Sequence, residues 1–335
     1  MEDVAQPRWV MEITDMLASK RLGISMVTAL ALGVGGIGAA HASAMTYSQL
    51  SIFGFQVFKS DGTTQWDVSD FDNLAVGNSG STSASLNSIP GSDGDSISPT
   101  SGPVDPAQAC QGADCGGIPQ NTFEQQPSGQ HFSRGDARLE GALITGLEGP
   151  SEVTADTVSE IQLSRSDGGT ASANLGTNTE FRFMLNEENS GEALDFQFSA
   201  VKLMEAMLGE PEGSVFVDQT FRISIRDEDA GQTIFAFSPD GSGARGITGG
   251  QALTDECNLN DEFGRTNNPG TSDATCSGNF RAVTNELMSG TNYSLNISHN
   301  AFTSASVQVP EPGTLALFGL GLLGVGAAGL RRRRS

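Results

Sequence analysis

Short runs of alternating apolar and polar residues recur along the chain and are separated by turn-forming residues. Phe221–Arg226 alternates strictly, and Phe196–Phe198 and Tyr293–Ile297 follow the same period of two. Alternate side chains of a strand point to opposite faces, so this period predicts strands with one buried face. Turn formers such as Asp167-Gly168-Gly169 and Asp240-Gly241 lie between the runs.

Runs of this kind fill most of the chain after Arg138. Strands do not alternate with long helical segments, and only Ala200–Leu208 has helical spacing. This series predicts a mainly β chain whose body is an antiparallel β-sandwich or is jelly-roll-like. The strands expected after Arg138 are Leu139–Leu147, Thr157–Leu163, Thr179–Leu185, Leu194–Met204, Val215–Arg226, Thr233–Phe237, Asn292–Ser298 and Ser304–Val309.

Composition divides the body into three parts. Residues 45–75 contain an apolar run, Tyr47–Phe58, which predicts a first strand. Residues 76–130 are rich in Ser, Gly, Pro, Asp and Asn, which predicts a long loop or linker. Residues 131–309 contain the other strands of the sandwich. We expect Tyr47–Phe58 to join this sandwich, and the alternative is a body made of two independent units.

The N-terminal segment, residues 1–44, has the features of a secretory signal peptide. Lys20 and Arg21 precede the apolar run Leu22–Ala40, and small residues then place candidate cleavage sites after Ala42 and after Ala44. This pattern predicts export by the Sec translocon and cleavage by signal peptidase. The alternative is an uncleaved N-terminal membrane anchor.

The residues before this signal are unusually acidic for the start of a signal peptide. Glu2, Asp3, Glu12 and Asp15 all precede the basic pair. We therefore expect translation to start at Met16, and a peptide from residues 1–15 in the precursor would contradict this.

An apolar run near the C-terminus predicts one transmembrane helix. It extends from Thr314 to Leu330 and would cover about 26 Å as a helix, close to the hydrocarbon thickness of about 30 Å. A basic cluster follows directly and predicts that this end stays in the cytoplasm. The cluster consists of Arg331, Arg332, Arg333 and Arg334. By these features alone, the chain is a single-pass membrane protein with its body outside the cytoplasm.

The same segment, residues 310–335, resembles the PEP-CTERM sorting domain of Gram-negative bacteria. Pro310-Glu311-Pro312 is followed by the Gly/Leu-rich run at 314–330 and the arginine cluster at 331–334. The resemblance implies recognition by an exosortase-like enzyme and removal of the temporary anchor near Pro-Glu-Pro. It also implies association with exopolysaccharide, the cell surface or a biofilm matrix. The alternative is a permanent anchor.

Charge narrows the possible partners of the body. Asp and Glu number 40 against 18 Lys and Arg, which gives a formal net charge of −22. A nucleic-acid-binding protein needs a basic face to neutralise phosphates. We therefore expect no nucleic-acid partner.

The chain contains 4 Cys, and its predicted export places them in an oxidising compartment. Three pairings are possible, and the local one, Cys110 with Cys115 and Cys257 with Cys276, is the one we expect. A zinc site is the alternative, but the cysteine spacing and the lack of nearby His fit zinc poorly.

The sequence predicts no catalytic residues and no cofactor. His131 and His299 are far apart, and no Gly-x-Ser-x-Gly motif occurs. Two acidic segments offer oxygen ligands for weak structural calcium, although solvated turn charges are the alternative. The calcium candidates are Asp227, Asp229, Asp255 and Asp261.

These observations predict an exported, non-enzymatic surface or matrix protein that an exosortase-type system sorts at its C-terminus. A secreted carbohydrate-binding module is the alternative, and it requires aromatic side chains clustered on one exposed sheet face. A secreted hydrolase is a further alternative, which requires paired carboxylates or a His-centred triad in a pocket.

Overall fold

A computed structural model describes residues 43–97, 102–164, 168–242 and 246–308 of the chain. The predicted signal peptide up to Ala42 and the predicted sorting segment at residues 309–335 lie outside these ranges. The strands are β1 (Ser43–Phe58), β2 (Phe71–Leu86), β3 (Ile89–Ile97), β4 (Ala109–Gly112), β5 (Phe132–Glu140), β6 (Val153–Ser164), β7 (Gly169–Leu185), β8 (Asp195–Leu208), β9 (Gly213–Asp227), β10 (Gln232–Phe237), β11 (Ile247–Thr248), β12 (Gly250–Asp255), β13 (Asp261–Thr266), β14 (Gly270–Thr284) and β15 (Tyr293–Val307). Short 3-10 helices form at η1 (Val68–Asp70), η2 (Cys115–Gly117) and η3 (Glu187–Asn189).

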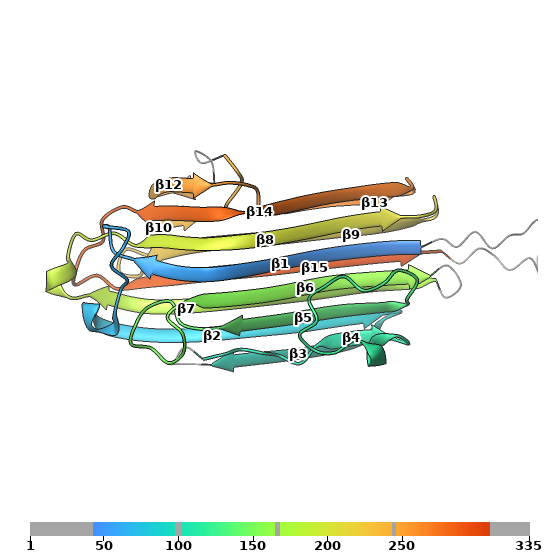
Figure 1. Cartoon of the computed structure of the whole chain (residues 1–335), viewed down its shortest axis with the longest axis horizontal. Coiled ribbons are helices and arrows are strands. Elements are labelled where there is room, and N and C mark those ends of the chain that lie inside the picture. The colour runs from blue at the N-terminus through green and yellow to red at the C-terminus, as the bar shows by residue number, and fades with distance from the viewer. Residues whose placement is uncertain (1–42, 98–101, 165–167, 243–245, 309–335) are drawn as a thin grey trace, which may run out of the picture. The chain divides into compact units, whose positions relative to one another are not determined.

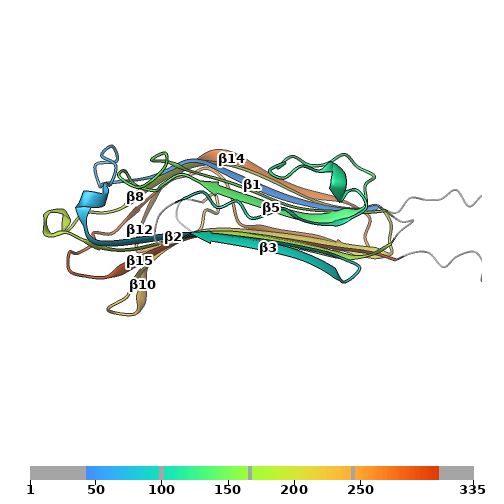
Figure 2. The same ribbon diagram turned by 90° about the horizontal axis from the view of Figure 1, so that it is seen from below.

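The strands form two antiparallel sheets that pack face to face, which confirms the predicted sandwich (Figures 1 and 2). Sheet 1 has seven strands in the order β12-β14-β8-β1-β6-β5-β4. Sheet 2 has eight strands, ordered β11-β10-β9-β15-β7-β2-β3 with β13 paired to β9. Consecutive long strands mostly alternate between the sheets, so each sheet is built from segments spread over the whole described chain.

The period of two seen in the sequence determines which side chains enter the core. In β9 the residues Val215, Val217, Gln219, Phe221, Ile223 and Ile225 are buried, and the residues between them face outward. The same alternation runs the whole length of β8, so the stretch 200–208 with helical spacing is a strand. Its cross-strand pairing with β1 and β14 overrides the weak helical preference of so short a segment.

The first and last strands occupy the centres of the two sheets. β1 lies between β6 and β8, and β15 lies between β7 and β9. Ala44 pairs with Leu163 and Val307 pairs with Gly169, so both strands leave the sandwich at the end where β6 turns into β7 (Figure 1). Because β1 is the central strand of sheet 1, the alternative of two independent units is wrong for the body.

Residues 76–130 are not the linker that their composition predicted. β2 pairs along its length with β7, and β3 extends the sheet beside β2. The inner face of β2 carries Asn78, Gly80, Thr82 and Ala84. These small or polar residues bring the layers close together, and Val104 and Pro106 pack directly over Gly80. The low hydrophobicity of this segment results from small residues that let the two layers pack closely, and for this reason composition wrongly predicted a linker.

The interior contains two apolar clusters with a belt of polar side chains between them. The larger cluster contains Phe55, Phe196, Phe221 and Trp66, and the smaller contains Ile161, Met204 and Val217. Most long strands that cross the interior change from one cluster to the other through inward-facing polar residues. This polar belt consists of Ser48, Thr157, Ser159, Thr179, Lys202, Gln219, His299 and Thr303, all buried.

Candidate functional site

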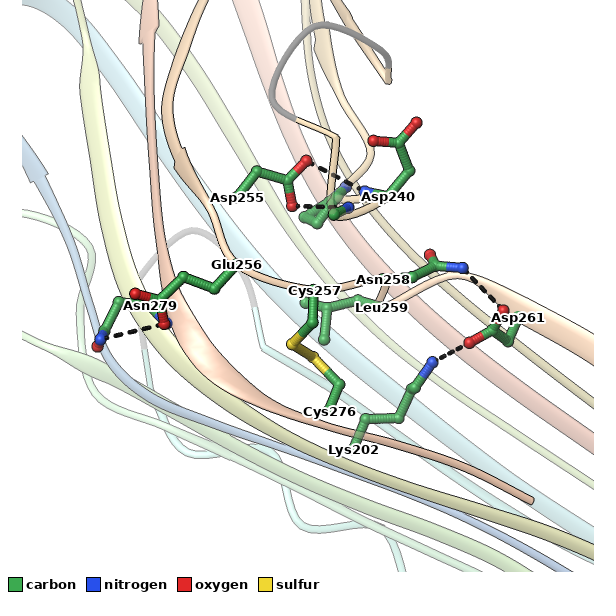
Figure 3. The surroundings of a disulfide bond; sticks show 12 residues. Lys202, Asp240, Asp255, Glu256, Cys257, Asn258, Leu259, Asp261, Cys276 and Asn279 are labelled. Carbon is green, nitrogen blue, oxygen red and sulfur yellow. Dashed lines mark hydrogen bonds and ion pairs between the residues drawn. A yellow bond between two sulfur atoms is a disulfide. The ribbon is translucent and has the colours of Figure 1, made fainter.

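The loop between β12 and β13 is fixed to sheet 1 by the predicted disulfide between Cys257 and Cys276 (Figure 3). Leu259 of this loop is fully buried in the larger apolar cluster. Asn260 accepts a hydrogen bond from Phe221 N at 2.7 Å and donates one to Pro239 O at 2.8 Å. A covalent bond, an apolar anchor and two hydrogen bonds therefore fix the backbone that leads into β13.

A lysine of the polar belt points at this loop from β8 (Figure 3). Lys202 is 1% exposed, and its ammonium forms an ion pair with Oδ2 of Asp261. The other carboxylate oxygen, Oδ1, accepts a hydrogen bond from Asn258 Nδ2 at 2.7 Å. The pair joins the two layers, because β8 belongs to sheet 1 and β13 pairs with β9 of sheet 2.

Sequence reasoning identified Asp261 as a calcium candidate and missed Lys202. The alternation in β8 could have identified this lysine, because Lys202 lies on the same strand face as Phe198, Ala200 and Met204. That register places a lysine on a face that is otherwise apolar.

The two pairs of calcium candidates lie at separate places and already accept hydrogen bonds. Asp229, in the β9–β10 turn with Asp227, accepts from Asn292 N at 2.9 Å, which lowers the pKa of its carboxyl. Asp255 Oδ1 accepts from Gly241 N at 3.1 Å, on the other side of the disulfide loop from Asp261. Among the residues that the structure describes, no three His, Cys, Asp or Glu side chains are grouped to hold a metal ion.

The second predicted disulfide, Cys110 with Cys115, joins β4 to η2. The chain that follows it, up to β5, covers the outer face of sheet 1. It is held there by Arg134, whose side chain is 0% exposed and pairs with the equally buried Glu160 at 2.8 Å. Arg134 also donates to the carbonyl oxygens of Thr122 at 2.5 Å and of Glu124 at 2.7 Å.

Asp136 and Tyr47 hold the same covering segment, and Glu160 accepts a hydrogen bond from its Gln126 N at 3.0 Å. Asp136 Oδ2 accepts from Asn121 N at 2.7 Å, and burial raises the pKa of Asp136 to about 6. The Tyr47 hydroxyl donates to Phe123 O at 2.7 Å, and burial raises the pKa of this phenol. Burial likewise raises the pKa of Glu160 above its ordinary value. Buried polar side chains of the sheet, together with Phe123 packed against Tyr47 and Val158, therefore order residues 121–126.

The two histidines of the body lie in different surroundings. His299 is 2% exposed, in the polar belt, with Nδ1 3.1 Å from Thr157 Oγ1. It lines a cavity of about 20 Å³ between the sheets, together with Phe55, Phe221 and Thr179. His131 lies next to β5 at the surface end of the covering segment, where its Nδ1 is 3.4 Å from Ser164 N.

The aromatic side chains that a sugar-binding face needs are mostly interior. The exposed large hydrophobic residues of the described ranges include one aromatic, Phe53. On the outer face of sheet 2, Phe216 and Phe302 form a half-buried pair with ring centroids 6.2 Å apart.

Of the residues predicted to direct processing, the described structure includes only Ala44. Ala44 is 1% exposed and belongs to β1, whereas Ala42 lies outside the described residues. Pro310, Glu311, Pro312, the run at 314–330 and the arginines at 331–334 also lie outside them. Within the described ranges, none of the helices has the length and apolar character to cross a membrane.

Comparison with known proteins identifies the C-terminal segment. Residues 308–334 match the family profile described as the PEP-CTERM protein-sorting motif, which begins directly after β15. No curated protein matches the chain, and no solved structure matches it either. The chain is thus an exported protein that carries a PEP-CTERM motif for exosortase-type sorting.

Proposed function

We propose that the sandwich is a non-enzymatic surface or matrix unit that associates with exopolysaccharide after C-terminal processing. The sorting motif at 308–334 carries this proposal, because it adjoins the folded body without an intervening domain. In this account the Sec translocon and signal peptidase deliver the chain. The predicted helix at 314–330 then holds it in the inner membrane until an exosortase-type enzyme acts near Pro310.

The outer face of sheet 2 supports association with a hydroxyl-rich polymer. Its central rows, read across β2, β7, β15 and β9, are built mostly from small hydroxyl and amide side chains. Asn174, Asn300, Thr220 and Ser81 are exposed at its centre. Hydroxyls and amides both donate and accept hydrogen bonds, so a flat array of them offers many weak contacts to a polysaccharide. The rows are Ser79-Asn178-Ser298-Arg222, Ser81-Gly176-Asn300-Thr220, Ser83-Asn174-Phe302-Asp218 and Ser85-Ser172-Ser304-Phe216.

Net charge supports the same role. At −22 the chain is repelled by anionic surfaces, yet divalent cations can bridge its carboxylates to an acidic polysaccharide. Weak calcium at Asp227 and Asp229, or at Asp255, is part of this proposal. Millimolar calcium is then expected to strengthen association, and chelation is expected to weaken it.

Co-sedimentation with exopolysaccharide purified from the producing organism tests the proposal. Asn174→Glu places a charge at the centre of the outer face of sheet 2, and we expect it to weaken binding to an acidic polymer about tenfold. Thr275→Glu places the same charge on the exposed outer face of β14 in sheet 1, and it serves as the matched control. Equal binding by both variants, or no binding by the unaltered protein, would overturn the proposal.

The Phe216–Phe302 pair favours one second candidate, a carbohydrate-binding module with a defined sugar site. Such a module would bind a short oligosaccharide saturably, and Phe302→Ala would abolish that binding. Matrix association predicts instead that short oligosaccharides fail to compete with the polymer. Calorimetric titration with oligosaccharides derived from the exopolysaccharide separates the two.

A further inference from the structure

Lys202 places a primary amine inside the sandwich. On β8 its cross-strand neighbours are Leu50 of β1 and Cys276 of β14, and the side chain is 1% exposed. An isolated ammonium is costly to bury, so it requires a partner. Figure 3 shows the side chain extended from β8 toward the loop, with its nitrogen directed at Asp261.

Asp261 is held where that amine can reach it. The disulfide at Cys257 and the buried Leu259 fix the loop, and Asn258 Nδ2 donates to Asp261 Oδ1 at 2.7 Å. The lysine contacts the other oxygen, Oδ2. One carboxylate oxygen therefore faces a neutral hydrogen-bond donor while the other faces the amine.

A second lysine–aspartate pair in the chain provides the contrast. Lys59 Nζ lies 2.9 Å from Asp70 Oδ1 and also 2.9 Å from Asn189 Oδ1. Its side chain is 22% exposed, so water and an amide oxygen share its protons. The Lys202 side chain is 1% exposed, whereas the Asp261 side chain is 31% exposed, so the desolvation cost of this pair falls on the ammonium.

We propose that Lys202 and Asp261 condense to an isopeptide bond that covalently joins sheet 1 to sheet 2. One proton passes from the Lys202 ammonium to Asp261 Oδ2, and the neutral amine then attacks Cγ. Charge develops on Oδ1, where Asn258 Nδ2 stabilises it. A second proton moves from nitrogen to Oδ2, the Cγ–Oδ2 bond breaks and one water leaves. The three ammonium protons are then accounted for, one on the amide nitrogen and two in the water.

The product explains why a lysine is placed in the belt. An amide carries no net charge, so condensation removes the cost of keeping the Lys202 ammonium away from water. The bond would also complete a covalent network around the loop, in which the Cys257–Cys276 disulfide links the loop to β14 and the amide links β13 to β8.

Peptide mapping of the full chain tests the proposal directly. Trypsin does not cleave after an acylated lysine, so after reduction we expect a branched peptide that joins residues 183–222 to residues 246–265. Its mass is expected to equal the sum of the two segments less one water. Recovery of cleaved peptides ending at Lys202, together with a linear 246–265 peptide of unmodified mass, would overturn the proposal.

Two controls separate condensation from a simple ion pair. Lys202→Arg keeps the charge but cannot form the amide, so the branched peptide is expected to disappear. Lys59 serves as the internal control, and trypsin is expected to cleave after it completely in the same digest. The mapping is performed on denatured protein, so the unaltered chain decides the outcome even if the arginine variant folds poorly.

Discussion

At the scale of single residues, burial alone lowers the pKa of His299 to about 3. Thr157 Oγ1 donates its only proton to Leu50 O at 3.0 Å, so the imidazole Nδ1, 3.1 Å away, must be the donor to Thr157. This fixes the neutral tautomer and leaves Nε2 as an acceptor. Nε2 has no partner among the described residues, and it borders a cavity of about 20 Å³, enough for one water.

This histidine predicts a pH dependence of stability. The unfolded chain protonates it near pH 6.5 and the folded chain only near pH 3, so the folded state loses stability as pH falls through that window. His299→Leu removes the effect, and the stability of the unaltered protein relative to this variant should fall by about 2 kcal/mol from pH 7 to pH 5. Urea unfolding of both proteins at the two pH values measures it.

Asp136 contributes an opposing pH dependence of stability, which the comparison of the two proteins removes. Its raised pKa of about 6 favours the folded state at low pH and opposes the histidine in the same window. Because Asp136 is present in both proteins, its contribution cancels in the difference. An equal response of both proteins to pH would contradict the account of His299.

Replacing the buried Arg134 of β5 is expected to lower the free energy of unfolding strongly. Arg134→Met leaves Glu160 buried without its charge partner, and we expect a loss of about 3–5 kcal/mol in the free energy of unfolding. Arg182→Met is the control, because Arg182 pairs with Glu180 at the exposed surface and should cost less than about 1 kcal/mol. Limited proteolysis should also cleave residues 121–126 faster in the first variant than in the second.

At the scale of elements, the two disulfides predict unequal contributions to stability. Cys257 and Cys276 are 19 residues apart, whereas Cys110 and Cys115 are 5 apart. Loop-closure entropy then gives about 3 kcal/mol for the first bond and about 2 kcal/mol for the second. Thermal or urea unfolding of each pair of Cys→Ser substitutions tests this order, and a larger loss for the shorter loop would contradict it.

The sequence allowed prediction of the strands whose inner face carries runs of alternating apolar residues. β9 follows from the alternation around Phe221, and β1 follows from Tyr47–Phe58. Asn292–Ser298 and Ser304–Val309, which were predicted as two strands, are parts of the single strand β15. The local disulfides followed from cysteine count and spacing, and both are confirmed.

Prediction failed where burial does not depend on hydrophobic side chains. β2 packs with Gly80 and Thr82 facing the core, and the covering segment at 121–126 is ordered by Arg134 and Asp136 of a different strand. Arg134-Gly135-Asp136 lies within β5, where a Cβ at Gly135 would make a tight contact of 3.2 Å with Ser83 O. These contacts join residues that are far apart in the sequence, so local patterns of apolar and polar residues do not predict them.

The polar belt gives the sandwich a second way to fix strand register. Ser48 donates to Gln219 at 2.9 Å and Ser159 bonds Thr303 at 2.6 Å, each between the two sheets. A slip of one residue would turn every inward side chain outward, and a slip of two would break these pairs. Apolar alternation alone excludes the first error but not the second.

At the scale of the molecule, the position of Ala44 predicts where the mature chain begins. Ala44 is buried at the start of β1, between Leu163 and Leu208 of the neighbouring strands. Cleavage after Ala44 would remove this pairing, whereas cleavage after Ala42 keeps β1 intact. We expect Ser43 to be the first residue of the secreted protein, which N-terminal peptide mass spectrometry measures. A chain that begins at Met45 would contradict this.

The two central strands lie at opposite ends of the sequence, so neither sheet is complete without a terminal strand. β15 pairs with both β7 and β9, and removing it would leave the middle of sheet 2 open. The sorting motif begins at residue 308, immediately after Val307. Everything the sandwich needs in order to fold therefore lies before the motif, and loss of the motif should not destabilise the body.

Two truncations test this arrangement. A chain that stops at Gln308 is expected to unfold cooperatively, with the same midpoint as the full chain. A chain that stops at Asn292 lacks all of β15 and is expected to show no cooperative transition, because β7 and β9 each lose a central partner. Circular dichroism with thermal unfolding distinguishes them. A cooperative transition in the shorter chain would show that the sandwich does not depend on its last strand, and the body would then fold before its final residues are in place.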